Sequence, residues 1–128
     1  SLITRAFGRI AETEAERYLR RKGYRILERN ERSPHGELDL VVQLGDLLVF
    51  VEVKARRTSA YGGAPHAVDG RKQAKLVKLA AQYLARHNLH NQACRFDVVL
   101  CTEDSAGRLA VEHIEQAFEA PGGTVWSG

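Results

Sequence analysis

The chain has 128 residues and a mass of 14.3 kDa, which suits one compact domain. Hydrophobic residues make up 44% of it and charged residues 27%, values that exclude a collagen-like or wholly disordered chain. The longest apolar run, Leu47 to Val51, is too short to cross a bilayer, and the opening residues do not read as a secretory signal. With only two cysteines, which we expect not to pair with each other, the sequence predicts a cytoplasmic, reduced protein without a membrane partner.

The formal net charge is +3, from 19 basic and 16 acidic residues. Most of the basic residues are arginines, whose planar guanidinium group suits paired hydrogen bonds to phosphate. The same balance of charges also suits an ordinary soluble surface. Charge alone therefore leaves a nucleic-acid partner and a merely solvated surface equally open.

The first half of the chain predicts one helix and three strands. A broad apolar stripe at helical spacing indicates a helix over about residues 3–22, which a glycine ends after a basic last turn. A short strand is expected over 24–29 and a polar loop over 30–36. Two strands rich in β-branched residues follow, over 37–43 and 47–54.

The second half predicts another helix and two more strands. A loop over 58–65 leads to a helix over about 70–87, for which Asp69 is the predicted N-cap. The continuous apolar run within 95–101 is typical of a strand that is buried on both faces. The remaining elements are a strand over 109–114 and a short helical turn over 115–120.

The resulting element order is α-β-β-β-α-β-β. This order implies an α/β fold in which a mixed β-sheet is flanked by helices. We expect a single domain over residues 1–120 and a flexible C-terminal tail over 121–128, where glycines cluster.

The middle of the chain carries the strongest local signal, because Gly45-Asp46 is typical of a two-residue hairpin turn. Pairing outward from that turn places Asp39 opposite Glu52. It also places Glu37 opposite Lys54, and all four side chains share one face of the hairpin. The other face is wholly apolar and holds Leu38, Leu40, Val42, Val49, Val51 and Val53.

The facing carboxylates of Asp39 and Glu52 need a physical reason, because like charges on directly opposite residues, with Cβ atoms roughly 5 Å apart, destabilise a sheet. A divalent cation between them supplies one, since hard cations prefer carboxylate oxygens. Lys54, on the same face, is placed to hold a water or a phosphate oxygen beside such a metal. Two alternatives stay open: Glu52 and Lys54 as a solvated charge pair, and Glu37 as the ion-pair partner of Lys54.

Asp39 followed by Glu52-Val53-Lys54 is the spaced Asp…Glu-x-Lys pattern of restriction-endonuclease-like nucleases. More specifically, the chain resembles the YraN-like family of small bacterial proteins of unestablished function, which is similar to archaeal-type Holliday-junction resolvases. The likeness covers about residues 11–100. Besides the hairpin, its matching pieces are Glu12…Ala15…Tyr18-Leu19…Gly23-Tyr24, Arg56-Arg57, Tyr61-Gly62-Gly63, Val68…Lys72-Gln73, Tyr83-Leu84 and Arg95-Phe96-Asp97-Val98-Val99.

The resemblance implies a restriction-endonuclease-like fold and a bound Mg²⁺ or Mn²⁺ ion. The implied metal ligands are Asp39, Glu52, the Val53 carbonyl and a first-helix carboxylate at Glu12. The resemblance also implies that Lys54 orients the attacking water, so Asp39, Glu52 and Lys54 are the expected catalytic residues. Because junction resolvases cut two strands, it suggests a homodimer.

Helix periodicity by itself favours a different carboxylate in the first helix. Glu14 lies near the middle of the apolar stripe, whereas Glu12 lies at its margin. The motif match selects Glu12, and the alternative role for Glu14 is that of an ion-pair partner for Arg17.

A nuclease site must hold a polyphosphate chain, and basic and aromatic residues near the hairpin are candidates for that contact. These candidates are Arg56, Arg57, Tyr61, Arg71, Lys72, Lys75 and Lys78. The basic residues of the second helix also suit an ordinary solvated helix face. Arg95 and Asp97, two apart in the buried strand, are instead expected to form an internal ion pair.

The leading hypothesis is a metal-dependent DNA phosphodiesterase of the endonuclease type, with branched or damaged DNA as its expected substrate. A second hypothesis is a non-catalytic nucleic-acid-binding module of the same fold. A third is a protein-interaction subunit that docks a basic partner through the acidic block of residues 101–128.

Overall fold

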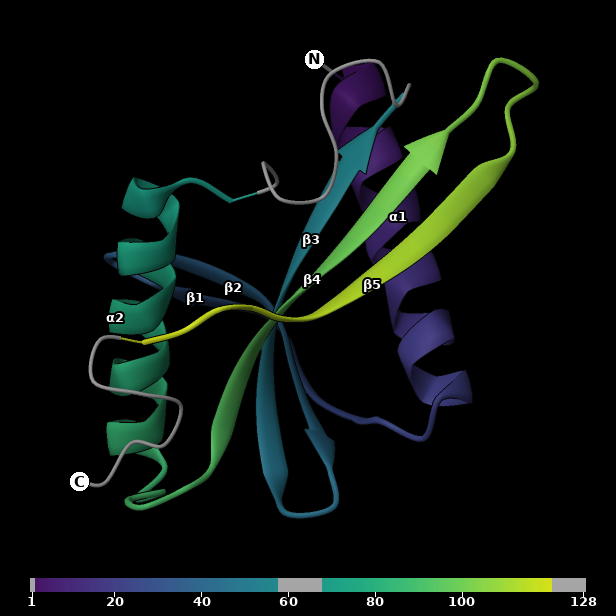
Figure 1. Ribbon diagram of the computed structural model, residues 1–128. Coiled ribbons are helices and arrows are strands. Elements are labelled where there is room, and N and C mark those ends of the chain that lie inside the picture. The colour runs from purple at the N-terminus through teal and green to yellow at the C-terminus, as the bar shows by residue number, and fades with distance from the viewer. Residues whose placement is uncertain (1, 58–67, 121–128) are drawn as a thin grey trace.

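The computed structural model describes residues 2–57 and 68–120 of the chain (Figure 1). Two helices and five strands follow the order α-β-β-β-α-β-β, which confirms the predicted α/β class. The predicted loop over 58–65 and the predicted tail over 121–128 lie outside the described residues. The elements are α1 (Leu2–Arg21), β1 (Arg25–Ser33), β2 (Gly36–Leu44), β3 (Leu47–Arg56), α2 (Gly70–Arg86), β4 (Cys94–Glu103) and β5 (Leu109–Phe118).

The five strands form one mixed sheet in the order β1-β2-β3-β4-β5. Only β3 and β4 are parallel, and α2 lies between them in the chain, because a parallel pair needs a long crossover connection. The two helices lie on opposite sides of the sheet, as Figure 1 shows. Asp69 caps α2 as predicted: its Oδ1 accepts the Lys72 N–H at 2.9 Å.

Each helix covers its own apolar layer of the sheet. The layer under α1 consists of Ala11, Ala15, Leu19, Tyr24, Leu40, Val42, Val49, Val51, Val99 and Cys101. The layer under α2 includes Leu38, Val41, Leu48, Phe50, Leu76, Leu79, Ala80, Tyr83, Leu84, Cys94, Phe96, Val98 and Phe118. Strand β4 contributes to both layers, so its run of buried residues confirms the predicted two-sided burial.

Two predicted boundaries are wrong. The segment 30–36 is a turn only at Pro34-His35, because β1 continues to Ser33 and pairs with β2 as far as Ser33↔Gly36. The segment 115–120 is not a helical turn, because β5 continues to Phe118, which pairs with Phe96 of β4. In both cases a neighbouring strand offers backbone hydrogen bonds that outweigh the local preference of a polar segment.

The hairpin register is confirmed where the two strands pair, from Leu44↔Leu47 to Leu40↔Val51. The backbone pairing of β2 with β3 ends at Leu40 and Val51, although both strands continue. Figure 1 shows β1 and β2 running toward α2, away from the upper part of β3. Leu38 consequently lies in the α2 layer while Leu40 lies in the α1 layer, so the prediction that these two leucines share one face is wrong.

Candidate metal centre

Asp39 lies just past the last β2–β3 pair, where the two strands separate. Its Oδ2 accepts the backbone N–H of Val53 at 2.9 Å. The Asp39 carboxylate thus accepts the hydrogen bond of the Val53 N–H at a point where β2 and β3 no longer form backbone pairs. This contact ties Asp39 to the Glu52-Val53-Lys54 segment, so the structure brings the predicted motif residues together.

Two further carboxylates meet Asp39 at this point. Oxygen atoms of Glu12, Glu37 and Asp39 all lie within 4.8 Å of one another. Glu52 is only 6% exposed, shares a hydrogen bond with Asp39, and acts on both Asp39 and Glu12 through its charge. Four acidic side chains from α1, β2 and β3 therefore gather at one edge of β3.

The protonation behaviour of this cluster reflects its crowded negative charge. Burial, and then the neighbouring Glu52 charge, raise the pKa of Asp39 from its ordinary value to about 8. The pKa of Glu12 is also raised, by burial first and then by the charge of Glu37. The positive charge nearby, that of Arg9 beside Glu12 included, does not balance these crowded carboxyl groups. A hard divalent cation supplies such charge, and carboxylate oxygens are the ligands it prefers, so the donor set fits Mg²⁺ or Mn²⁺.

Glu12 and Glu14 lie in different surroundings in the structure. Glu12 lies in the carboxylate cluster. Glu14 instead forms an ion pair with Arg17, with 3.4 Å between Oε1 and Nη1, as the alternative for that residue predicted. The structure therefore places at the site the helix carboxylate that the motif match selected, and it leaves Glu14 away from it.

Lys54 is half-buried and follows Glu52 by two residues in β3, so both side chains emerge on the same side of the strand. Within residues 2–57 and 68–120, no hydrogen bond or ion pair engages its ammonium group. The alternative in which Glu37 pairs with Lys54 is wrong: Glu37 pairs with Arg32, with 3.2 Å between Oε2 and Nε. On the same side of β3 as Glu52, a lysine ammonium has hydrogen-bond donors that can bind a water or a phosphate oxygen.

The predicted phosphate-contacting residues divide into three groups. Lys72 reaches the site, with its Nζ 3.4 Å from Glu52 Oε2. Arg56 donates to Thr102 Oγ1 of β4 at 3.3 Å, and the Arg57 guanidinium lies 5.5 Å from the ring centre of Phe7 in α1. Both side chains therefore contact neighbouring elements. Arg71, Lys75 and Lys78 are exposed on α2, whereas Tyr61 lies outside the described residues.

Lys75 also shapes the turn between β1 and β2. A Cβ built on Gly36 would come within 2.6 Å of Lys75 Cε, so the lysine stem lies directly over the backbone of Gly36. The φ of Gly36 is +141°, a conformation that residues with a side chain rarely adopt. Both facts explain why glycine precedes the Glu37-Leu38-Asp39 segment.

A cavity of about 220 Å³ adjoins the carboxylate cluster between α1 and the β1–β2 pair. Sequence reasoning missed Arg9, which lines this cavity and whose charge partly offsets the raised pKa of Glu12. The sequence could have indicated this contact, because residues three apart on a helix, as Arg9 and Glu12 are, lie next to each other. The cavity is lined by Arg9, Glu12, Thr13, Glu16, Arg29, Asn30, Asp39 and Leu40.

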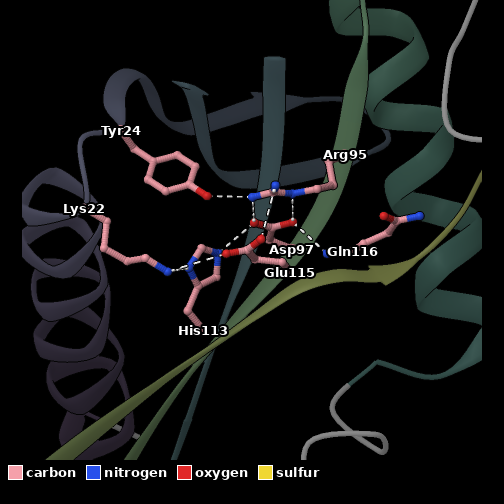
Figure 2. Close-up of polar contacts among 7 residues, drawn as sticks. All are labelled: Lys22, Tyr24, Arg95, Asp97, His113, Glu115 and Gln116. Atoms are coloured by element: carbon pink, nitrogen blue, oxygen red, sulfur yellow. Dashed lines mark hydrogen bonds and ion pairs between the residues drawn. The ribbon is translucent and has the colours of Figure 1, made fainter. Parts of the chain in front are cut away.

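A second polar cluster, centred on Asp97, lies on the α1 side of β4 (Figure 2). The predicted ion pair is confirmed: Arg95 Nε and Nη2 each donate to an Asp97 oxygen at 2.8 Å. His113 Nε2 lies 2.7 Å from Asp97 Oδ2, and the Gln116 N–H donates to Oδ1 at 3.0 Å. Arg95 Nη2 also donates to the Tyr24 hydroxyl at 2.6 Å.

Asp97 is 1% exposed, and its surroundings are matched to its charge. Burial by itself would raise the pKa of this carboxyl group, but the hydrogen bonds from His113 and Arg95 outweigh burial and hold it below its ordinary value. At the rim of the cluster, Lys22 Nζ lies 3.1 Å from His113 Nδ1 and 3.6 Å from Glu115 Oε2. The cluster therefore satisfies its own charges and holds β4, β5 and the end of α1 together.

Comparison with known proteins places the chain among uncharacterised relatives. The family model described as "Uncharacterised protein family UPF0102" matches residues 11–101. A UPF0102 protein of Frankia casuarinae is 50% identical over 113 residues, which cover 88% of this chain and 96% of that protein. A UPF0102 protein of Pelotomaculum thermopropionicum is 50% identical over 87% of this chain and 93% of its own length. A UPF0102 protein of Moorella thermoacetica is 44% identical over 92% of this chain and 99% of its own length.

Neither described helix is long and apolar enough to cross a membrane.

Proposed function

We propose that this chain, which belongs to the uncharacterised protein family UPF0102, is a divalent-metal-dependent DNA phosphodiesterase of the endonuclease type. The observation that carries the proposal is the carboxylate cluster itself: Asp39 accepts the Val53 N–H, and burial together with the neighbouring Glu52 charge raises its pKa to about 8. A crowded group of carboxylates, with Lys54 emerging on the same side of β3 as Glu52, fits metal-assisted phosphate chemistry better than a structural role.

The proposed metal, Mg²⁺ or Mn²⁺, would be held by Asp39, Glu52, Glu12 and the Val53 carbonyl. Bound there, it would lower the pKa of a water molecule and stabilise negative charge on the phosphate. Glu37 adds a fourth carboxylate to the cluster, which the family resemblance did not imply. In this proposal the carboxylates hold the metal, and their combined negative charge favours a doubly charged cation.

Lys54 is proposed to orient the attacking water and to contact the phosphate that is cleaved. Its half-buried position keeps the ammonium close to β3, and the strand period places it on the same side as Glu52. A lysine ammonium can donate up to three hydrogen bonds, which suffices for both contacts.

DNA is proposed as the substrate because Lys72, in the first turn of α2, reaches Glu52 of the site, and further basic residues lie on the same helix. Arg71, Lys75 and Lys78 are exposed there, and the whole chain is basic with a net charge of +3. Branched or damaged DNA and a homodimer are proposed from the likeness to junction resolvases. A cytoplasmic location agrees with the two buried, unpaired cysteines.

The test is cleavage of end-labelled DNA forks, four-way junctions and single strands with Mn²⁺ or Mg²⁺, with EDTA as the metal-free control. Wild-type protein is compared with Lys54→Ala and with Lys78→Ala, which removes an exposed lysine of α2. We expect Lys54→Ala to lower the cleavage rate by about 10²–10⁴-fold, and Lys78→Ala to weaken DNA binding while the cleavage rate at saturating protein stays close to that of wild type.

Two outcomes would contradict the proposal in different ways. Equal cleavage by wild type and Lys54→Ala would remove Lys54 from the site or reveal a contaminant. DNA binding without cleavage by any variant would favour the non-catalytic nucleic-acid-binding module. The exposed basic face of α2 supports this non-catalytic alternative.

A further inference from the structure

Lys72 forms an ion pair with the most buried carboxylate of the candidate metal centre. Its Nζ lies 3.4 Å from Glu52 Oε2, where Glu52 is 6% exposed and the Lys72 side chain is 37% exposed. The backbone of Lys72 is fixed independently, because its N–H donates to the capping side chain of Asp69 at 2.9 Å. The side chain can therefore move while its anchor in the first turn of α2 stays in place.

The length of this ion pair indicates a weak bond. Charge-assisted N–H···O bonds are usually about 2.7–2.9 Å long, and partly exposed ion pairs contribute little to stability. Lys72 nevertheless provides a positive charge for Glu52, which shares a hydrogen bond with Asp39 of the carboxylate cluster. It thereby occupies an oxygen that the proposed metal would need.

We propose that the metal and Lys72 exchange at Glu52: metal binding releases the Lys72 ammonium, which then binds a non-bridging oxygen of the DNA phosphate at the site. The inference rests on the proposed function and deepens it by giving one lysine two successive partners. A lysine suits this exchange because its ammonium is a compact charge on a flexible four-carbon stem. No covalent bond is made or broken. The metal takes the place of the ammonium at Glu52, and the ammonium contacts a phosphate oxygen instead.

The exchange makes two predictions of opposite sign for the loss of Lys72. Without DNA, the lysine competes with the metal, so its removal strengthens metal binding. With metal bound, the lysine contacts DNA, so its removal weakens DNA binding. A residue that only held Glu52 in position would weaken metal binding when removed, and one that acted only through its charge would strengthen it. In neither case would its contribution to DNA binding depend on metal.

The first measurement is Mn²⁺ binding by calorimetry, without DNA, for wild type, Lys72→Gln and Lys78→Gln. Glutamine keeps most of the stem, and the capping bond uses the backbone N–H, so Lys72→Gln retains the start of α2. We expect Lys72→Gln to bind Mn²⁺ about two- to fivefold more tightly than wild type, the range of a partly exposed ion pair. The control Lys78→Gln removes a positive charge from the exposed face of α2 and is expected to change the affinity less.

The second measurement is DNA affinity for the same proteins in Ca²⁺, which takes the same oxygen ligands, and in EDTA. A denaturing gel checks that the DNA stays intact. We expect Lys72→Gln to weaken binding in Ca²⁺ only, and Lys78→Gln to weaken it equally in both buffers.

The failures of the two proposals are distinguishable. If wild type binds Mn²⁺ and Lys72→Gln binds it no more tightly, the exchange is wrong while the metal site stands. If Lys72→Gln weakens DNA binding equally in Ca²⁺ and EDTA, the lysine is a constant DNA contact and the exchange is again wrong. If wild type binds no Mn²⁺, the proposed function fails and the exchange fails with it.

Discussion

Asp39 and Asp97 occupy comparable places in the sheet and behave in opposite ways. Each lies where strand pairing is irregular: Asp39 past the last β2–β3 pair, and Asp97 at the register shift between β4 and β5. Each accepts one backbone N–H, from Val53 and from Gln116 respectively. The pKa of Asp39 is nevertheless raised, whereas that of Asp97 is lowered.

The difference comes from the charges that surround each carboxyl group. Asp97 receives hydrogen bonds from Arg95 and His113. Asp39 has further carboxylates around it, and Glu52 among them raises its pKa. A buried aspartate is therefore no sign of function by itself. The sign of its neighbours separates a carboxylate that holds strands together from one that needs a cation from outside.

Replacing Asp97 should produce the largest loss of stability. Asp97→Asn removes the charge that Arg95 and His113 face, and leaves a 15% exposed guanidinium group with only its longer ion pair, 3.4 Å from Nη1 to Glu115 Oε1. We expect the free energy of unfolding to fall by about 3–5 kcal/mol, the cost of breaking a buried pair. Urea unfolding followed by circular dichroism measures it. A loss below about 1 kcal/mol would mean that the cluster contributes no more than a surface ion pair.

Replacing Asp39 should have the opposite effect. Asp39→Asn removes a carboxylate from a crowded negative cluster, so the metal-free protein should gain about 1 kcal/mol at pH 7, as substitutions at strained functional sites often do. The same variant should lose Mn²⁺ binding. Parallel urea titrations and calorimetry test both statements, and a destabilised Asp39→Asn would show that the Val53 contact matters more than charge repulsion.

The two aspartates should also give stability a different pH dependence. Because the folded pKa of Asp39, about 8, lies above its unfolded value, the stability linked to Asp39 is present below about pH 4 and is lost as pH rises toward 8. The folded pKa of Asp97 lies below its unfolded value, so its contribution is present above about pH 4 and is lost on further acidification.

Unfolding experiments between pH 3 and pH 9 on metal-free wild type, Asp39→Asn and Asp97→Asn separate the two contributions. The decline in stability between about pH 4 and pH 8 should be missing in Asp39→Asn and retained in Asp97→Asn. A decline that survives in Asp39→Asn would have to arise from other groups, Glu12 among them, because its pKa is raised as well.

Metal binding should release protons, which is the smallest of the expected effects. At pH 7 the Asp39–Glu52 pair still holds a proton, since the pKa of Asp39 is about 8, and carboxylate ligands must give up their protons to bind a metal. We expect Mn²⁺ to release up to about one proton at pH 7 and almost none near pH 9. Calorimetry in buffers with different ionisation enthalpies counts the protons, and release that does not change with pH would contradict the raised pKa.

The sequence by itself determined the features that depend on residues close together in the chain. The spacing of apolar residues predicted the element order, and the two-residue turn predicted the register of the paired part of the hairpin. The i, i+2 spacing of Arg95 and Asp97 in a strand predicted their ion pair, because alternate residues of a strand share a face. Local rules suffice where partners are a few residues apart.

Only the tertiary structure decided which distant groups became neighbours. It extended β1 and β5 beyond their predicted ends, because a neighbouring strand supplied the hydrogen bonds. It brought Glu12 and Glu37 to Asp39, Lys72 to Glu52, and His113 to Asp97. The sign of each pKa shift follows from these neighbours. Electrostatic interactions depend on distances through space, and only the packed fold sets the distance between residues that lie far apart in the chain.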